Sequence, residues 1–200
     1  MNQDDALYPC SFVIFGATGH LAATKLLPAL YHLELAERLP EVTNFVALGR
    51  REWTDADWAS HMEQALRQKL GPKFTSECFS RFAARFSYVR GDLKDSQAYK
   101  RLFEELGKPK TGVCSNIVFY LAVKPEDFGP IVENLAVVGL NRPRGLHRIV
   151  VEKPFGEDIA SAQQLNQALH RHFDEQQIYR SIIRLAKRKT SRFCTLSFAR

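Results

Sequence analysis

Residues 11–22 constrain the fold of this chain more than any other stretch, because an apolar run leads directly into a glycine turn. Phe12–Phe15 is short, continuously apolar and rich in β-favouring residues, as expected of a strand buried on both faces. Gly16, Gly19 and Ala22 follow at three-residue spacing. Small residues there allow a tight turn, close approach of a pyrophosphate to backbone N–H groups, and close packing of the next helix. The turn therefore predicts a phosphate site at a helix N-terminus, where anions are favoured.

The end of the second apolar run, Asn44–Leu48, indicates which dinucleotide would bind. It continues into Gly49-Arg50-Arg51. An acidic residue at this point hydrogen-bonds a free ribose 2′-hydroxyl, whereas a guanidinium pairs with a 2′-phosphate. We therefore predict NADP in preference to NAD, with Arg50 at the 2′-phosphate. The alternative is that Arg50 and Arg51 are solvated loop charges.

Strand patterns alternate with helix patterns along the rest of the chain. Alternation of this kind implies right-handed crossovers, a parallel sheet, and ligands at the carboxyl ends of the strands. We expect a doubly wound α/β fold with a mainly parallel sheet. The expected strands cover residues 12–15, 44–48, 86–89, 116–123 and 148–152, and the expected helices cover 26–37, 55–70, 78–86, 96–106, 128–138 and 161–173.

Composition narrows the class of protein. The 200 residues, 45% of them hydrophobic, suffice for one domain with a core, or for one domain and part of another. No apolar segment has the length needed to span a bilayer, and the N-terminus lacks a basic segment followed by an apolar one. We expect a cytoplasmic protein without a membrane partner. The four cysteines show no metal-ligand spacing, which predicts reduced thiols and no metal site.

The net charge of +6 is confined to one segment. Six of the 28 basic residues lie in residues 180–193, which contain no acidic residue, and the other 22 balance the 22 acidic residues. No aromatic residue is interleaved with them between Arg180 and Arg192, as single-stranded nucleic acid would require. We therefore predict no nucleic-acid partner.

A second specific motif, Glu152-Lys153-Pro154-Phe155-Gly156, ends the last expected strand. A lysine at the carboxyl end of a buried strand is a compact cation that faces the ligand cleft. It suits an anionic substrate or a hydroxyl near a nicotinamide ring. The plain structural alternative is an ordinary turn at the end of a strand.

Several motifs, in order over residues 8–180, resemble the N-terminal coenzyme domain of the glucose-6-phosphate dehydrogenase family. They are the Gly-Ala-Thr-Gly turn, Lys25-Leu26-Leu27-Pro28, Gly49-Arg50, Gly91-Asp92, Tyr120-Leu121-Ala122, the 152–156 motif, and Ile178-Tyr179-Arg180. The resemblance implies a Rossmann-like fold and oxidation of glucose 6-phosphate at C1 to the lactone, with hydride transfer to NADP. It also implies a homo-oligomer, with contacts mainly from a domain absent here.

The resemblance also assigns residues to the site. Lys153 and Lys187 are expected to bind the substrate, Lys187 at the sugar phosphate and Lys153 between cofactor and sugar. The residues expected to bind the cofactor are Gly16, Ala17, Thr18, Gly19, His20, Leu21, Ala22, Arg50, Asp92, Leu93, Ala122 and Lys153.

The chain departs from the family pattern at His20, where the family has Asp, and over residues 181–188. There the family reads Ile-Asp-His-Tyr-Leu-Gly-Lys-Glu, and only Leu185 and Lys187 match, with Ile183 in the place of a phosphate-binding His. Resemblance returns at Leu196-Ser197-Phe198-Ala199. Two compensating frameshifts would produce such a patch, a hypothesis that an uninterrupted, well-supported coding frame over residues 180–193 would contradict.

We expect residues 1–180 to form the NADP-binding domain and residues 181–200 to begin a truncated second β+α domain. The catalytic His and the Asp that orients it in the family lie beyond Arg200. Without that general base, we expect the chain by itself to bind cofactor and to be impaired in turnover.

Two other readings remain open from the sequence. A short-chain reductase or epimerase uses a Tyr-x-x-x-Lys pair, and Tyr120 and Lys124 have this spacing. Such a pair works from one helix face, whereas residues 116–123 favour a strand. The other reading is a non-catalytic NADP-binding module.

Overall fold

The computed structural model describes residues 10–108, 116–142, 147–152, 159–181 and 198–199. Within these ranges seven strands form one sheet, in the order β3-β2-β1-β4-β5-β6-β7. The first six run parallel and β7 is antiparallel to β6. This confirms the predicted doubly wound fold. The strands are β1 (Ser11–Phe15), β2 (Asn44–Gly49), β3 (Phe86–Arg90), β4 (Ile117–Leu121), β5 (His147–Glu152), β6 (Ile178–Ser181) and β7 (Phe198–Ala199).

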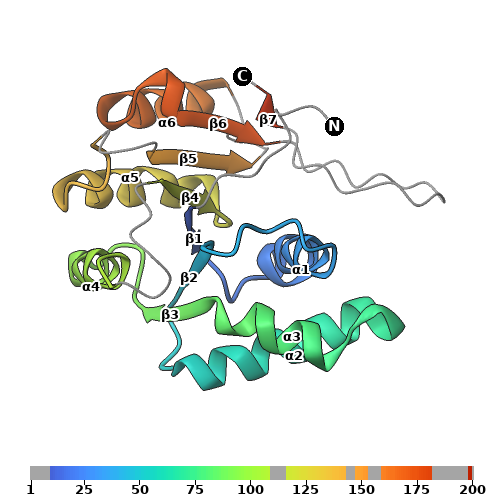
Figure 1. Cartoon of the computed structure of the whole chain (residues 1–200). Helices are drawn as coiled ribbons and strands as arrows, with labels where there is room; N and C mark the ends of the chain where they lie inside the picture. Colours follow the sequence, from blue (N-terminus) through green and yellow to red (C-terminus); the bar gives the residue numbers. More distant parts are fainter. Residues whose placement is uncertain (1–9, 109–115, 143–146, 153–158, 182–197, 200) are drawn as a thin grey trace.

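Helices cover both faces of the sheet (Figure 1). On one face lie α1 (Leu27–Leu35), α2 (Asp55–Leu70) and α3 (Ser76–Ala84), and on the other lie α4 (Ser96–Leu106), α5 (Phe128–Val137) and α6 (Ile159–His172). Short 3₁₀ turns occupy Gly71–Lys73, Pro125–Asp127 and Glu175–Gln177, and a π-helical turn, Ala22–Leu26, precedes α1.

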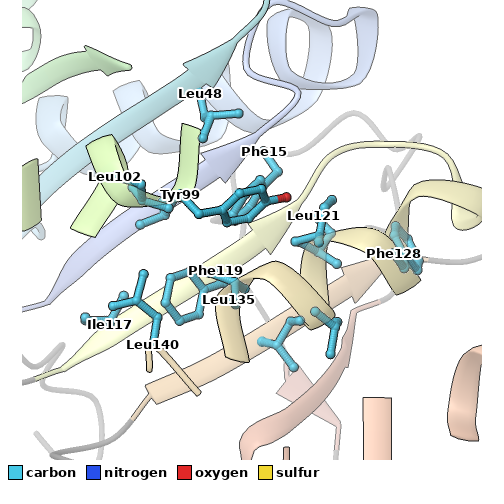
Figure 2. Close-up of a cluster of buried hydrophobic side chains, with 14 of the residues drawn as sticks. Phe15, Leu48, Tyr99, Leu102, Ile117, Phe119, Leu121, Phe128, Leu135 and Leu140 are labelled. Atoms are coloured by element: carbon cyan, nitrogen blue, oxygen red, sulfur yellow. The ribbon is translucent and has the colours of Figure 1, made fainter. Parts of the chain in front are cut away.

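Two hydrophobic clusters, one on each face of the sheet, explain the unbroken apolar runs in the central strands. Phe12 and Ile14 of β1 belong to the cluster under α1, α2 and α3, whereas Val13 and Phe15 belong to the cluster under α4, α5 and α6. Figure 2 shows the second cluster, in which Phe15 lies beside Tyr99 of α4. Because both faces are buried, β1 has no polar face, and its sequence does not alternate.

Helix caps account for the boundaries that the sequence predicted well. Thr54 and Asp57 form a capping box at the start of α2, and the Asp95 carboxylate accepts from Gln97 N at the start of α4. Both helices have the predicted bounds. The predicted 78–86 helix was wrong at both ends: Thr75 caps α3, which therefore begins at Ser76, and Phe86 belongs to β3.

Most other predicted boundaries differ by one or two residues, and one strand was not predicted. The first helix ends at Leu35 and not at Glu37, because Glu37 has a left-handed backbone (φ 53°) and Arg38 N bonds back to Leu33 O. The strand at Ile178–Ser181, where β6 joins the edge of β5, was not among the predicted strands. None of the helices within the described ranges is long and apolar enough to cross a membrane.

Candidate dinucleotide-binding site

The glycine turn lies between the carboxyl ends of β2 and β4. Gly16 has a positive φ of 75°, and a Cβ there would lie 2.6 Å from Val123 Cγ1 and 2.7 Å from the Ala122 carbonyl oxygen. On the other side, a Cβ on Gly49 would lie 2.9 Å from Thr18 Cγ2. Both strand ends thus hold the turn closely, and only glycine fits at its first position.

The residues of the turn divide into those that build it and those that present donors. Ala17 is fully buried and its N–H donates to Leu48 O (3.2 Å), and Gly19 N donates to Gly16 O (2.9 Å). Helical backbone begins at His20, whose side chain is exposed. First-turn N–H groups of a helix have no carbonyl one turn earlier, so those from His20 to Ala22 are the donors available to an anion.

A π-helical turn follows at once, where the sequence predicted ordinary helix. Leu27 N bonds to Ala22 O, five residues back. This π-helical turn contains one more residue than an α-helical turn, and Lys25 lies within it. Such π-bulges are frequent at functional sites. Nothing in the sequence pattern signals this distortion.

The two arginines after β2 have different surroundings. The Arg51 guanidinium lies 4.8 Å from the centre of the Trp53 ring, and its carbonyl accepts from the Tyr88 hydroxyl (3.0 Å). Arg50 is exposed and lines a cavity of about 510 Å³. Arg50 therefore lines this cavity, whereas Arg51 packs on Trp53.

The 510 Å³ cavity lies between the ends of β2 and β3 and the start of α4. Its lining residues are Arg50, Arg90, Gly91, Asp92, Asp95 and Arg101. Asp92 Oδ1 accepts from Lys94 N (2.9 Å), and Leu93 O accepts from the Tyr99 hydroxyl (2.7 Å). These two hydrogen bonds fix the loop after β3, which carries the predicted cofactor residues Asp92 and Leu93. Ala122, at the end of β4, faces Gly16 on the other side of the turn.

Sequence reasoning missed a carboxylate at this edge of the sheet. Tyr120 is 1% exposed, and its hydroxyl donates to Glu152 Oε1 at the end of β5. Burial raises the pKa of Glu152, and the nearby Lys25 ammonium opposes that rise. The motif 152–156 drew attention to its lysine, and only the strand register shows that Glu152 shares a face with Tyr120.

The raised pKa of Glu152 gives a pH dependence of stability. A folded state that holds the proton more tightly than the unfolded chain loses stability as the pH rises from about 4.3 through the folded pKa. Relative to Glu152→Gln, wild type is therefore expected to lose unfolding free energy between pH 4 and pH 7 in urea titrations. Taking the difference between the two proteins cancels the other groups, and a flat or rising difference would contradict the assignment.

Some predicted residues are not tested by this geometry. Lys153 and Lys187 lie outside the described residues. Tyr120 and Lys124 do not share a helix: Tyr120 is in β4, and Lys124 Nζ lies 3.5 Å from Glu126 Oε1 in the following turn. The helical geometry of a Tyr-x-x-x-Lys acid–base pair is absent at these two residues.

Comparison with known proteins agrees with the fold and the turn. Residues 13–187 match the family model described as glucose-6-phosphate dehydrogenase, NAD binding domain. Glucose-6-phosphate 1-dehydrogenase 2 of Mycobacterium bovis is 37% identical over 195 residues, 96% of this chain and 38% of that protein. The enzyme of Mycolicibacterium smegmatis is 40% identical over 174 residues, 86% of this chain and 35% of that protein.

A solved structure extends the match to three dimensions. The crystal structure of glucose-6-phosphate 1-dehydrogenase from Mycobacterium avium superposes with a TM-score of 0.76 at 37% identity, covering 86% of this chain and 36% of that one. The chain therefore spans well under half the length of the relatives it matches. Together these matches confirm the resemblance and a nicotinamide dinucleotide as the family's cofactor, and the chain belongs to the glucose-6-phosphate dehydrogenase family, of which it contains the NAD-binding domain.

Proposed function

We propose that this chain binds NADP, with the pyrophosphate at residues 16–22 and the 2′-phosphate at Arg50. The observation that carries the proposal is the position of the glycine turn. It lies between the ends of β2 and β4, with a helix N-terminus directly after it. Oriented N–H groups and the helix dipole favour a phosphate there without any charged side chain.

The preference for NADP over NAD rests on the charges at the end of β2. A guanidinium donates two parallel hydrogen bonds to a phosphate, and no carboxylate of residues 49–51 competes for it. Asp92 and Leu93 line the cofactor site beyond Arg50, and Ala122 lines it at the end of β4. In this proposal residues 1–180 form the cofactor domain and residues 181–200 begin the next one.

For the whole protein we propose oxidation of glucose 6-phosphate at C1 to the lactone. Bound NADP would supply the hydride acceptor, Lys187 would bind the sugar phosphate, and Lys153 would bind the substrate between cofactor and sugar. This chain orients the cofactor at the carboxyl edge of the sheet. Because Ile183 replaces a phosphate-binding His and offers no donor, we assign cofactor binding, and not turnover, to the chain by itself.

Arg50→Ala tests the proposal directly. We expect the dissociation constant for NADP to rise by about one to two orders of magnitude, because a charge-assisted hydrogen-bond pair is lost. The dissociation constant for NAD should stay within about twofold, since NAD has no 2′-phosphate. Isothermal titration of the full chain with each dinucleotide measures both.

Arg51→Ala is the matched control. It removes the same charge at the neighbouring residue, whose side chain packs on Trp53. Its NADP affinity should remain close to wild type. A folded wild-type chain that binds neither dinucleotide would refute the proposed function. Equal losses in Arg50→Ala and Arg51→Ala would refute the assignment of the 2′-phosphate to Arg50.

A further inference from the structure

The cavity beside Arg50 contains a second arginine that the sequence did not single out. Arg90 is the last residue of β3 and is aligned with Gly49 of β2. Gly91 N donates to Gly49 O (2.9 Å), which holds the two strand ends together. Arg50 and Arg90 therefore enter the same cavity from neighbouring strands.

The third arginine of the cavity has a different role. Arg101 of α4 donates through Nε (3.2 Å) and Nη2 (3.0 Å) to the Arg90 carbonyl oxygen. Its Nη2 also lies 3.4 Å from Asp95 Oδ2. Arg101 thus fixes the backbone of Arg90 to α4. The side chain of Arg90 is not held by these bonds and can change its partner.

The Arg90 guanidinium pairs with the Glu52 carboxylate, and this contact is exchangeable. The two side chains are 58% and 73% exposed. Exposed ion pairs contribute at most about 1 kcal/mol, because water solvates both partners well. Moving Arg90 from Glu52 to a phosphate would therefore cost little, and a phosphate offers three strong acceptor oxygens.

We propose that Arg90 is a second specificity-determining residue. When NADP binds, the Arg90 guanidinium exchanges the Glu52 carboxylate for the 2′-phosphate and holds it together with Arg50. The inference rests on the proposed function and adds a residue to it. A second guanidinium suits this cavity because Asp92 and Asp95 also line it and repel a phosphate, and Arg101 offsets only Asp95. Glu52 acts as an internal competitor that holds Arg90 when no dinucleotide is bound.

Two substitutions with opposite expected effects test the inference in the full chain. In Arg90→Ala, the NADP dissociation constant should rise about tenfold while that of NAD changes less than twofold. In Glu52→Gln, which keeps the shape but removes the competing charge, NADP should bind about threefold more tightly. Isothermal titration measures both, and thermal unfolding checks that each variant is folded.

Arg67→Ala is the control for the loss of one positive charge, because Arg67 is also an exposed arginine in an ion pair, with Glu63 of α2. It should leave both affinities unchanged. If wild type and Arg50→Ala behave as proposed while Arg90→Ala keeps the wild-type NADP-to-NAD ratio, this inference fails and the proposed function stands. Equal weakening of NADP and NAD in Arg90→Ala would show a merely structural role. If wild type binds neither dinucleotide, both proposals fail together.

Discussion

Gly16→Ala should destabilise the chain by about 3 kcal/mol and lower its affinity for NADP at least tenfold. The first part follows from the backbone, because a φ of 75° disfavours any residue with a Cβ, by about 1 kcal/mol or more. A further loss of stability comes from steric overlap, because the new methyl would lie 2.6 Å from Val123 Cγ1 and 2.7 Å from the Ala122 carbonyl oxygen. Overpacking of this kind costs about 1–3 kcal/mol.

The loss of affinity has the same origin. To relieve the overlap, the turn must move away from the end of β4, and the N–H groups of the next helix turn move with it. Those donors act on a phosphate only within about 3.2 Å. Urea denaturation gives the stability, and titration at a temperature where the variant is folded gives the affinity.

Gly129→Ala is the matched control for the glycine substitution. Gly129 lies in the first turn of α5, and apart from its chain neighbours and the backbone of its own helix, a Cβ there would meet no atom within 4 Å. The helix preference of alanine is offset here because Pro130 follows and disfavours a Cβ on a helical residue before it, so the stability of this variant should stay within about 1 kcal/mol of wild type. It should bind NADP as wild type does. A Gly16→Ala chain with wild-type stability would contradict the role assigned to the turn.

Local signals account for what the sequence predicted well. The runs at Phe12–Phe15 and Asn44–Leu48 identify central strands, because only strands buried on both faces are apolar throughout. The bounds of α2 follow from its cap residues, since a capping box is encoded within four residues. The glycine turn is equally local. Each of these features depends on neighbours in the chain and on little else.

What could not be predicted depends on residues distant in sequence. Arg50 and Arg51 are adjacent and chemically identical, and only the packing of Arg51 on Trp53 and its bond to Tyr88 separate them. Glu152 looks like an ordinary charged residue at a strand end until the register brings Tyr120 beside it. The pairing of Arg90 with Glu52 likewise requires β2 and β3 to be neighbours.

A buried carboxylate on the helix that follows the glycine turn is the clearest case of such long-range dependence. Glu34 of α1 is 4% exposed. Its Oε2 lies 3.0 Å from Arg85 Nε, and its Oε1 lies 3.8 Å from Arg81 Nε of α3. The Arg85 guanidinium also donates to the carbonyls of Pro40, Glu41 and Thr43 at 2.9–3.3 Å. One carboxylate thus connects α1, α3 and the loop that enters β2.

Glu34→Ala should therefore lower the unfolding free energy by about 3 kcal/mol, the lower end of the range for breaking a buried ion pair. Arg85 is 18% exposed, so water compensates only part of the lost carboxylate. Glu63→Ala is the control, since Glu63 forms an exposed pair with Arg67 and its loss should cost less than about 1 kcal/mol. Urea denaturation of both variants measures the difference, and equal losses would show that burial of Glu34 contributes nothing.

The same variant separates stability from binding. Glu34 lies at the end of α1 distant from the glycine turn, and its partners come from α3 and the following loop, not from the residues around Arg50. At temperatures where Glu34→Ala is folded, we expect its NADP affinity within about twofold of wild type, because the donors at the helix start keep their positions. Arg50→Ala should show the reverse, with wild-type stability and weak NADP binding. If Glu34→Ala weakened NADP binding as much as Arg50→Ala does, the turn would depend on the whole length of α1, and its local anchoring between β2 and β4 would not suffice to hold it.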